Sequence, residues 1–184
     1  MRIEKVTQAF NVELEWKMFP LHPETPPEGQ SLEALFAGRA YDPEESYQRM
    51  KGLMDEEGLP YARRSHTYNS RMAQELAKWA DTIPGFQTLH DALYRAYFVD
   101  NANIGELEVL LGIAGSVGLD RNEARAVLEE RRFKAEVDAD WLKSRQYGVT
   151  GVPTFVSNMQ GVVGAQPYEV LVQLMEQAGV ERRA

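Results

Sequence analysis

The stretch from Gly148 to Val156, Gly-Val-Thr-Gly-Val-Pro-Thr-Phe-Val, constrains the fold of this chain more than any other. Pro153 stands at the start of an apolar run, and proline has no N–H to give to a sheet ladder. It is therefore tolerated chiefly at the first residue of a strand or on an edge. A proline flanked by Gly151 and a β-branched run is also a good candidate for a cis peptide bond in a tight loop. We predict that this loop presents backbone donors and acceptors to whatever lies against it.

The residues behind the loop predict a hairpin and a closing helix. We expect strands at 154–157 and 162–165, joined by a turn at 158–161. A helix at 166–179 follows, because Val170, Leu171, Leu174 and Met175 form an apolar stripe at helical spacing, and Gly179 is placed as a C-terminal stop.

The first nineteen residues predict a helix and a strand. Ile3, Val6 and Phe10 lie on one side of a helix that ends near Asn11. In 12–19, apolar residues at every second position alternate with Glu and Lys, which is typical of a half-buried strand.

The middle of the chain predicts a block of helices. Ser31, Asp42, Asn69 or Ser70, and Asp120 are each placed to cap a helix start. Apolar stripes and breakers set the expected ranges: 31–36, 42–57, 70–83, 86–98, 106–117, 120–130 and 133–147.

The string 148–156, with the hairpin and helix behind it, resembles the cis-proline end of a thioredoxin fold of the DsbA-like branch. Within that branch it looks most like the FrnE-type proteins, which are related to the 2-hydroxychromene-2-carboxylate isomerases. The resemblance implies an α/β, thioredoxin-like (DsbA-type) fold with a large helical insertion, lacking the first strand and the start of the first helix. Residues 1–30 and 131–184 would form the thioredoxin-like part, and 31–130 the inserted helical subdomain.

The sequence contains no cysteine, whereas the family carries its chemistry on a Cys-x-x-Cys at the start of the first helix. Residues 1–11 resemble the second half of that helix, so the first strand and the cysteine pair would lie upstream of Met1. We therefore expect a redox-inactive chain with no catalytic residue of its own. The missing central strand leaves three possibilities: a start placed too late, direct pairing of the two remaining strands, or a strand lent by a second copy in a homodimer.

The resemblance implies a substrate-binding site at Thr150, Gly151, Val152 and Pro153, where the Val152 backbone would pair with an extended substrate. The expected partner is a peptide or a small glutathione-like thiol. Two alternatives stay open: a non-catalytic binding or dimerisation module, and a glutathione-dependent isomerase of the hydroxychromene type.

Composition and charge exclude several other classes. A net charge of −8 and a pI near 5.0 argue against nucleic acid as a partner. The basic pairs Arg63-Arg64 and Arg131-Arg132 are expected on solvated faces.

No apolar run is long enough to span a bilayer, and the amino end lacks the pattern of a secretory signal, so we expect a cytoplasmic protein without a membrane partner. His22, His66 and His90 lie on different elements, so we expect no metal and no cofactor.

Overall fold

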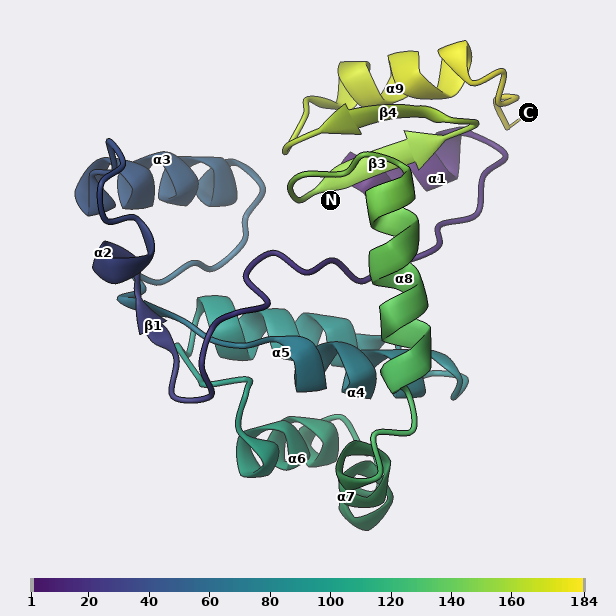
Figure 1. The fold of residues 1–184 in the computed structure, drawn as a ribbon. Helices are drawn as coiled ribbons and strands as arrows, with labels where there is room; N and C mark the ends of the chain where they lie inside the picture. The colour runs from purple at the N-terminus through teal and green to yellow at the C-terminus, as the bar shows by residue number, and fades with distance from the viewer. Residues whose placement is uncertain (1, 184) are drawn as a thin grey trace. The chain divides into compact units, whose positions relative to one another are not determined.

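The structure is a computed structural model that describes residues 2–183 of the chain. Its residues form two compact units, Met1–Leu21 with Ala139–Ala184, and His22–Asp138 (Figure 1). The division at 30/31 and 130/131 that the sequence suggested differs from these limits, since the first unit is shorter on both sides of the intervening segment.

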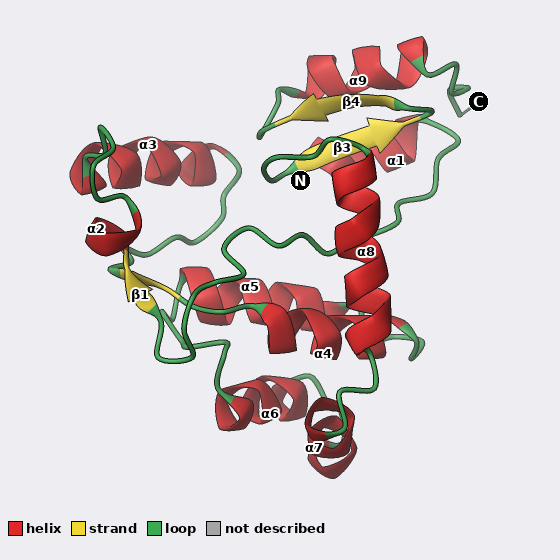
Figure 2. Cartoon of the chain, viewed as in Figure 1, coloured by secondary structure: helices red, strands yellow, loops and turns green. Residues whose placement is uncertain are grey.

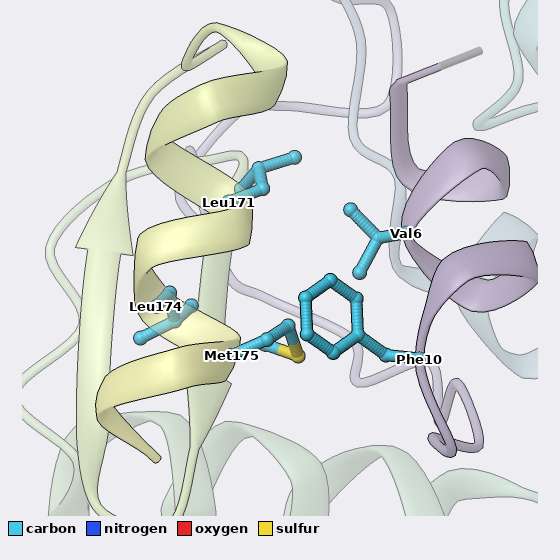
Figure 3. Packing of buried hydrophobic residues seen from close by; sticks show 5 residues of the cluster. All are labelled: Val6, Phe10, Leu171, Leu174 and Met175. Atoms are coloured by element: carbon cyan, nitrogen blue, oxygen red, sulfur yellow. The ribbon is translucent and has the colours of Figure 1, made fainter. Parts of the chain in front are cut away.

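The first unit is built from two helices and a hairpin. The helices are α1 (Arg2–Ala9) and α9 (Tyr168–Gln177), and the strands are β3 (Thr154–Ser157) and β4 (Gln160–Val163). Val6 and Phe10 pack against α9, and Figure 3 shows both side chains pointing toward that helix. Phe155 and Val162, which face each other across the hairpin, cover the same core. Burial of each large apolar side chain stabilises such a core by roughly 1.5–3 kcal/mol.

The hairpin closes through a tighter turn than the sequence suggested. Asn158 and Met159 have φ values of 46° and 67°, and Ser157 pairs directly with Gln160. Two residues with positive φ form the primed type of turn, which matches the right-handed twist of the flanking strands. The expected four-residue turn and a second strand at 162–165 are therefore wrong, because β4 begins at Gln160 and ends before Gly164, whose φ is +92°.

The expected strand at 12–19 is also wrong. Residues 11–20 form no regular structure, and Figure 2 draws them as a loop. Leu14 and Trp16 are 39% and 48% exposed, although the alternation placed them on the buried face. The segment is held instead by side chains of its own unit. The buried Asp140 carboxylate accepts a hydrogen bond from Met18 N (3.0 Å) and lies 3.4 Å from Lys17 Nζ.

Direct pairing of 12–19 with 154–157 does not occur among the described residues. The sheet that contains β3 has only β4 as its second strand. Alternating hydrophobicity allows a segment to form a strand with one face buried. The strand also needs a neighbouring strand whose backbone N–H and C=O groups are free to pair with it. Direct pairing of the two remaining strands, one of the three possibilities that the sequence left open, is therefore wrong for the described residues.

The second unit is largely helical. Three predicted caps are confirmed: Asp42 accepts hydrogen bonds from Glu44 N and Glu45 N, Asp120 accepts two in the same way, and Ser31 Oγ accepts one from Ala34 N. Its elements are β1 (Gln30–Ser31), α2 (Leu32–Leu35), α3 (Pro43–Glu56), β2 (His66–Thr67), α4 (Arg71–Asp81), α5 (Thr88–Phe98), α6 (Leu107–Ser116) and α7 (Arg121–Glu129), and α8 (Lys134–Gln146) begins in it. The antiparallel pair of β1 and β2 was not predicted, because two-residue strands carry no hydropathy pattern.

A buried carboxylate ties α4 to the end of α7. Glu75 is fully buried and accepts hydrogen bonds from Arg71 Nε (2.6 Å), Arg131 Nε (2.8 Å) and Arg131 Nη2 (2.6 Å). Arg131 lies on an exposed face, as the sequence predicts, and its guanidinium also neutralises the buried carboxylate of Glu75.

Candidate functional site

The predicted site begins where α8 ends. Gly148, with φ +67°, follows the last turn of this helix. Its N–H donates to Arg145 O (3.0 Å), and Val149 N donates to Ser144 O (3.0 Å). This is the usual glycine-dependent way to satisfy the last carbonyls of a helix, and it turns the chain sharply into the segment 149–153.

All four predicted binding residues lie in this segment. Thr150, Val152 and Pro153 are exposed and Gly151 is half-buried. The Val152–Pro153 peptide bond is cis. Two contacts fix the loop to the hairpin: Thr154 Oγ1 donates to Gly151 O (2.7 Å), and Gly164 N donates to Pro153 O (2.7 Å). The loop is thus held at Gly151 and at Pro153, with Val152 between them.

Val152 is the residue of the loop whose backbone is free to bind a ligand. Its residue surface is 51% exposed. Among the described residues, no hydrogen bond involves its backbone N–H or C=O, whereas the neighbours at 151 and 153 both have bonded carbonyls. A backbone donor and acceptor on an exposed loop are available to an extended ligand.

The hairpin continues this exposed surface. Phe155 and Val162 face the core, so the alternate residues of the two strands face the other way. Val156 and Val163 lie on this outer face and are 41% and 53% exposed. The sheet of β3 and β4 has no further strand in the described part of the chain, so both of its edges lack a strand partner. We call Val156 and Val163 the valine face.

In the described part of the chain, the three histidines do not come together as a metal site. His90 Nε2 lies 2.7 Å from Asp81 Oδ1, and His66 Nδ1 lies 2.9 Å from Ser65 Oγ. Burial, followed by the charge of Arg39, lowers the pKa of His22 from its ordinary value. Within residues 2–183 no three His, Asp or Glu side chains are grouped so that they could hold a metal ion.

No helix in that range has the length and apolar character of a membrane span.

Comparison with known proteins gives the class to which this geometry belongs. The family model of the DSBA-like thioredoxin domain matches residues 1–176. The chain therefore belongs to this family, and its fold is the DSBA-like thioredoxin fold, rich in helix with small sheets.

Three known proteins are similar to the chain. The crystal structure of a probable DsbA oxidoreductase from Streptomyces coelicolor is 34% identical, with a TM-score of 0.85, and the match covers 97% of this chain and 82% of that one. The uncharacterized protein YwbO of Bacillus subtilis (strain 168) is 26% identical over 170 residues, which are 91% of this chain and 82% of the relative. A structure from Nitrosomonas europaea at 18% identity, with a TM-score of 0.58 and 74% of each chain covered, shares the fold.

Sequence reasoning found the loop but missed the valine face. The order Thr-Phe-Val along β3 already places Phe155 opposite to its two neighbours, and this was the available signal. The same reasoning put Arg64 on a solvated face, where the structure instead stacks it on aromatic rings.

Proposed function

We propose that this chain is a binding member of the DsbA-like family, which holds a peptide in an extended conformation at Thr150, Gly151, Val152 and Pro153. The observation that carries the proposal is the unpaired, exposed backbone of Val152 beside the valine face. An extended peptide would exchange backbone hydrogen bonds with Val152, and its side chains would cover the apolar surface.

The absence of cysteine limits what this polypeptide can do with its ligand. Thiol–disulfide exchange requires a thiolate that attacks a disulfide sulfur and forms a mixed disulfide. None of the 184 residues can supply that sulfur. A ligand at the loop would therefore be bound without being oxidised or reduced by this chain.

A titration followed by NMR tests the proposal. We would add an uncharged, apolar ten-residue peptide and, separately, glutathione to the 15N-labelled chain. Saturable shifts of the amides at 150–152, with those of the valine face, are expected for the peptide. Shifts there with glutathione alone would make the ligand a small thiol, and no saturable shift with either would refute binding at the loop.

Two matched substitutions locate the contact. Val152→Glu places a charge where the peptide would lie and should weaken binding about tenfold or more, because the carboxylate must be desolvated. Met159→Glu at the hairpin turn is the control, because Met159 is 79% exposed and is not part of the loop. Equal loss in both variants would mean that binding depends on charge alone.

A second candidate is dimerisation through the same valine face. It is favoured by the exposed apolar side chains and by strand edges that lack a partner. Size-exclusion chromatography with light scattering should then give twice the 20.9 kDa of the chain, and Val163→Lys should return it to a monomer. A wild-type monomer at high concentration would remove this candidate.

A further inference from the structure

The β3–β4 hairpin has an exposed apolar outer face. On this face Thr154 lies opposite Val163. Val156 lies opposite Gly161, which is itself exposed. Thr154 is the polar residue of the face, but its Oγ1 already donates to Gly151 O (2.7 Å). The valine face and the glycine therefore form a surface with no free side-chain donor between the two valines.

Gly161 leaves a space open on this face. Its φ is not in the positive range, so the backbone conformation does not require glycine. A Cβ at this position would lie 3.5 Å from Val156 Cγ2 and 3.3 Å from Phe155 O. Any other residue would therefore occupy the space beside the Val156 methyl group, whereas glycine leaves the backbone of β4 exposed there.

The chain around this space carries no charge. Residues 146–168 include no Asp, Glu, Lys or Arg, although 26% of the whole chain is charged. Exposed faces of soluble proteins normally carry charged side chains, and their depletion is typical of the central part of an interface. A charged ligand group would lose its water here without meeting an opposite charge. The surface therefore matches an uncharged partner.

A planar ring is the group that suits this space. Glycine within a strand often marks a place where a ligand approaches the backbone closely, and an aromatic ring can cover such a glycine. Val156 borders the space across the hairpin, and Val163 borders it two residues along β4. An aromatic side chain buries about 150–250 Å² in such contacts, which is more than an aliphatic side chain can bury.

We propose that the hairpin selects uncharged peptides with an aromatic residue, whose ring covers Gly161 between Val156 and Val163. The inference rests on the proposed binding at the Thr150–Pro153 loop and adds the class of peptide to it. Val152 and Val156 are four residues apart, a span that about four residues of an extended peptide can cover. Gly161 determines the specificity, because a side chain of the protein at this position would take the place of the ring.

Three peptides of equal length test the aromatic preference. Each is the uncharged ten-residue peptide, with Phe, Leu or Ala at its centre, and its affinity is measured by calorimetry. We expect the Phe peptide to bind about tenfold more tightly than the Ala peptide and about threefold more tightly than the Leu peptide. Equal affinities would overturn the aromatic preference and leave binding at the loop intact. No binding of any peptide would refute the proposed function itself.

The position of the ring has a separate readout. The ring current of an aromatic group shifts nuclei that lie over its face upfield. The methyl signals of the valine face and the amide of Gly161 should therefore move upfield with the Phe peptide and not with the Leu peptide. Tight binding of the Phe peptide with these signals unmoved would contradict the assignment of the ring to Gly161.

A matched pair of glycine substitutions locates the contact. Gly161→Ala fills the space, so we expect about fivefold weaker binding of the Phe peptide and no change for the Ala peptide. Gly112→Ala in α6 is the control, because its Cβ would meet nothing within 4 Å. Equal weakening in both variants would count against the proposal. Because the new Cβ at 161 crowds Phe155 O, folding of that variant is checked by circular dichroism, and if it does not fold, the wild-type measurements decide.

A second copy of the chain is the other possible occupant of this face. If the chain is a dimer that Val163→Lys dissociates, the Phe peptide should compete with the second copy and return the wild type to a monomer. A dimer of this kind that persists in the presence of saturating Phe peptide would overturn the proposal.

Discussion

At the scale of single residues, Glu75 shows how a charge is kept in an apolar interior. Burial alone raises the pKa of its carboxyl, but the hydrogen bonds and charges of Arg131 and Arg71 outweigh that effect and hold the pKa below its ordinary value of 4.5. Removal of one partner from such a cluster costs more than the cluster itself contributes, because the remaining charges stay buried.

We predict that Glu75→Gln lowers the free energy of unfolding at pH 7 by about 2 kcal/mol. The folded-state pKa is lower than the unfolded one, so the wild-type contribution is complete above pH 4.5 and is lost as the pH falls through the folded value. The variant should lack this acid-dependent part. Urea denaturation of both proteins between pH 7 and pH 3 measures the difference.

Glu130→Gln is the matched control for this prediction. Hydrogen bonding by Arg132 lowers the pKa of Glu130 too, but the pair is exposed to solvent and screened by it. Its substitution should change stability very little. If both variants lose the same amount, the burial of Glu75 is not what makes its ion pairs important.

At the scale of elements, the turn of the β3–β4 hairpin is set by two residues with positive φ. Asparagine tolerates this conformation, whereas methionine pays a steric penalty because its Cβ approaches the backbone. Met159 is also 79% exposed, so its side chain contributes little to packing.

We predict that Met159→Gly stabilises the protein by about 0.5–1 kcal/mol, because Asn-Gly is the preferred pair for this turn. A rise in the midpoint of thermal unfolding, measured by circular dichroism, would show it. Met159→Ala keeps the Cβ and should give no such rise. A gain of equal size with alanine would instead indicate that removal of an exposed apolar side chain is responsible.

At the scale of the whole molecule, the absence of cysteine separates the fold from the chemistry of its family. The loop, the hairpin and α9 are all present, but the sulfur that carries out exchange is not in these residues. We predict that the chain, assayed at micromolar concentration with dithiothreitol, reduces insulin no faster than dithiothreitol alone. A turbidity rate above that background would overturn this account of the chemistry.

The sequence by itself determined the features that depend on local interactions. The caps at Asp42 and Asp120, the apolar stripes of the helices and the start of β3 after Pro153 follow from backbone geometry and from spacing along the chain. The resemblance of the string 148–156 to the cis-proline end of DsbA-like proteins indicated the family, and the family model over residues 1–176 confirms it.

Only the tertiary structure decided which groups find partners. Residues 12–19 have the alternation of a strand but no neighbouring ladder, so Asp140 holds them as a loop. Arg131 and Arg64 belong to two similar basic pairs, yet one meets the buried Glu75 and the other meets only aromatic rings. Hydrogen bonds and ion pairs join residues far apart in sequence, and no local pattern specifies their partners.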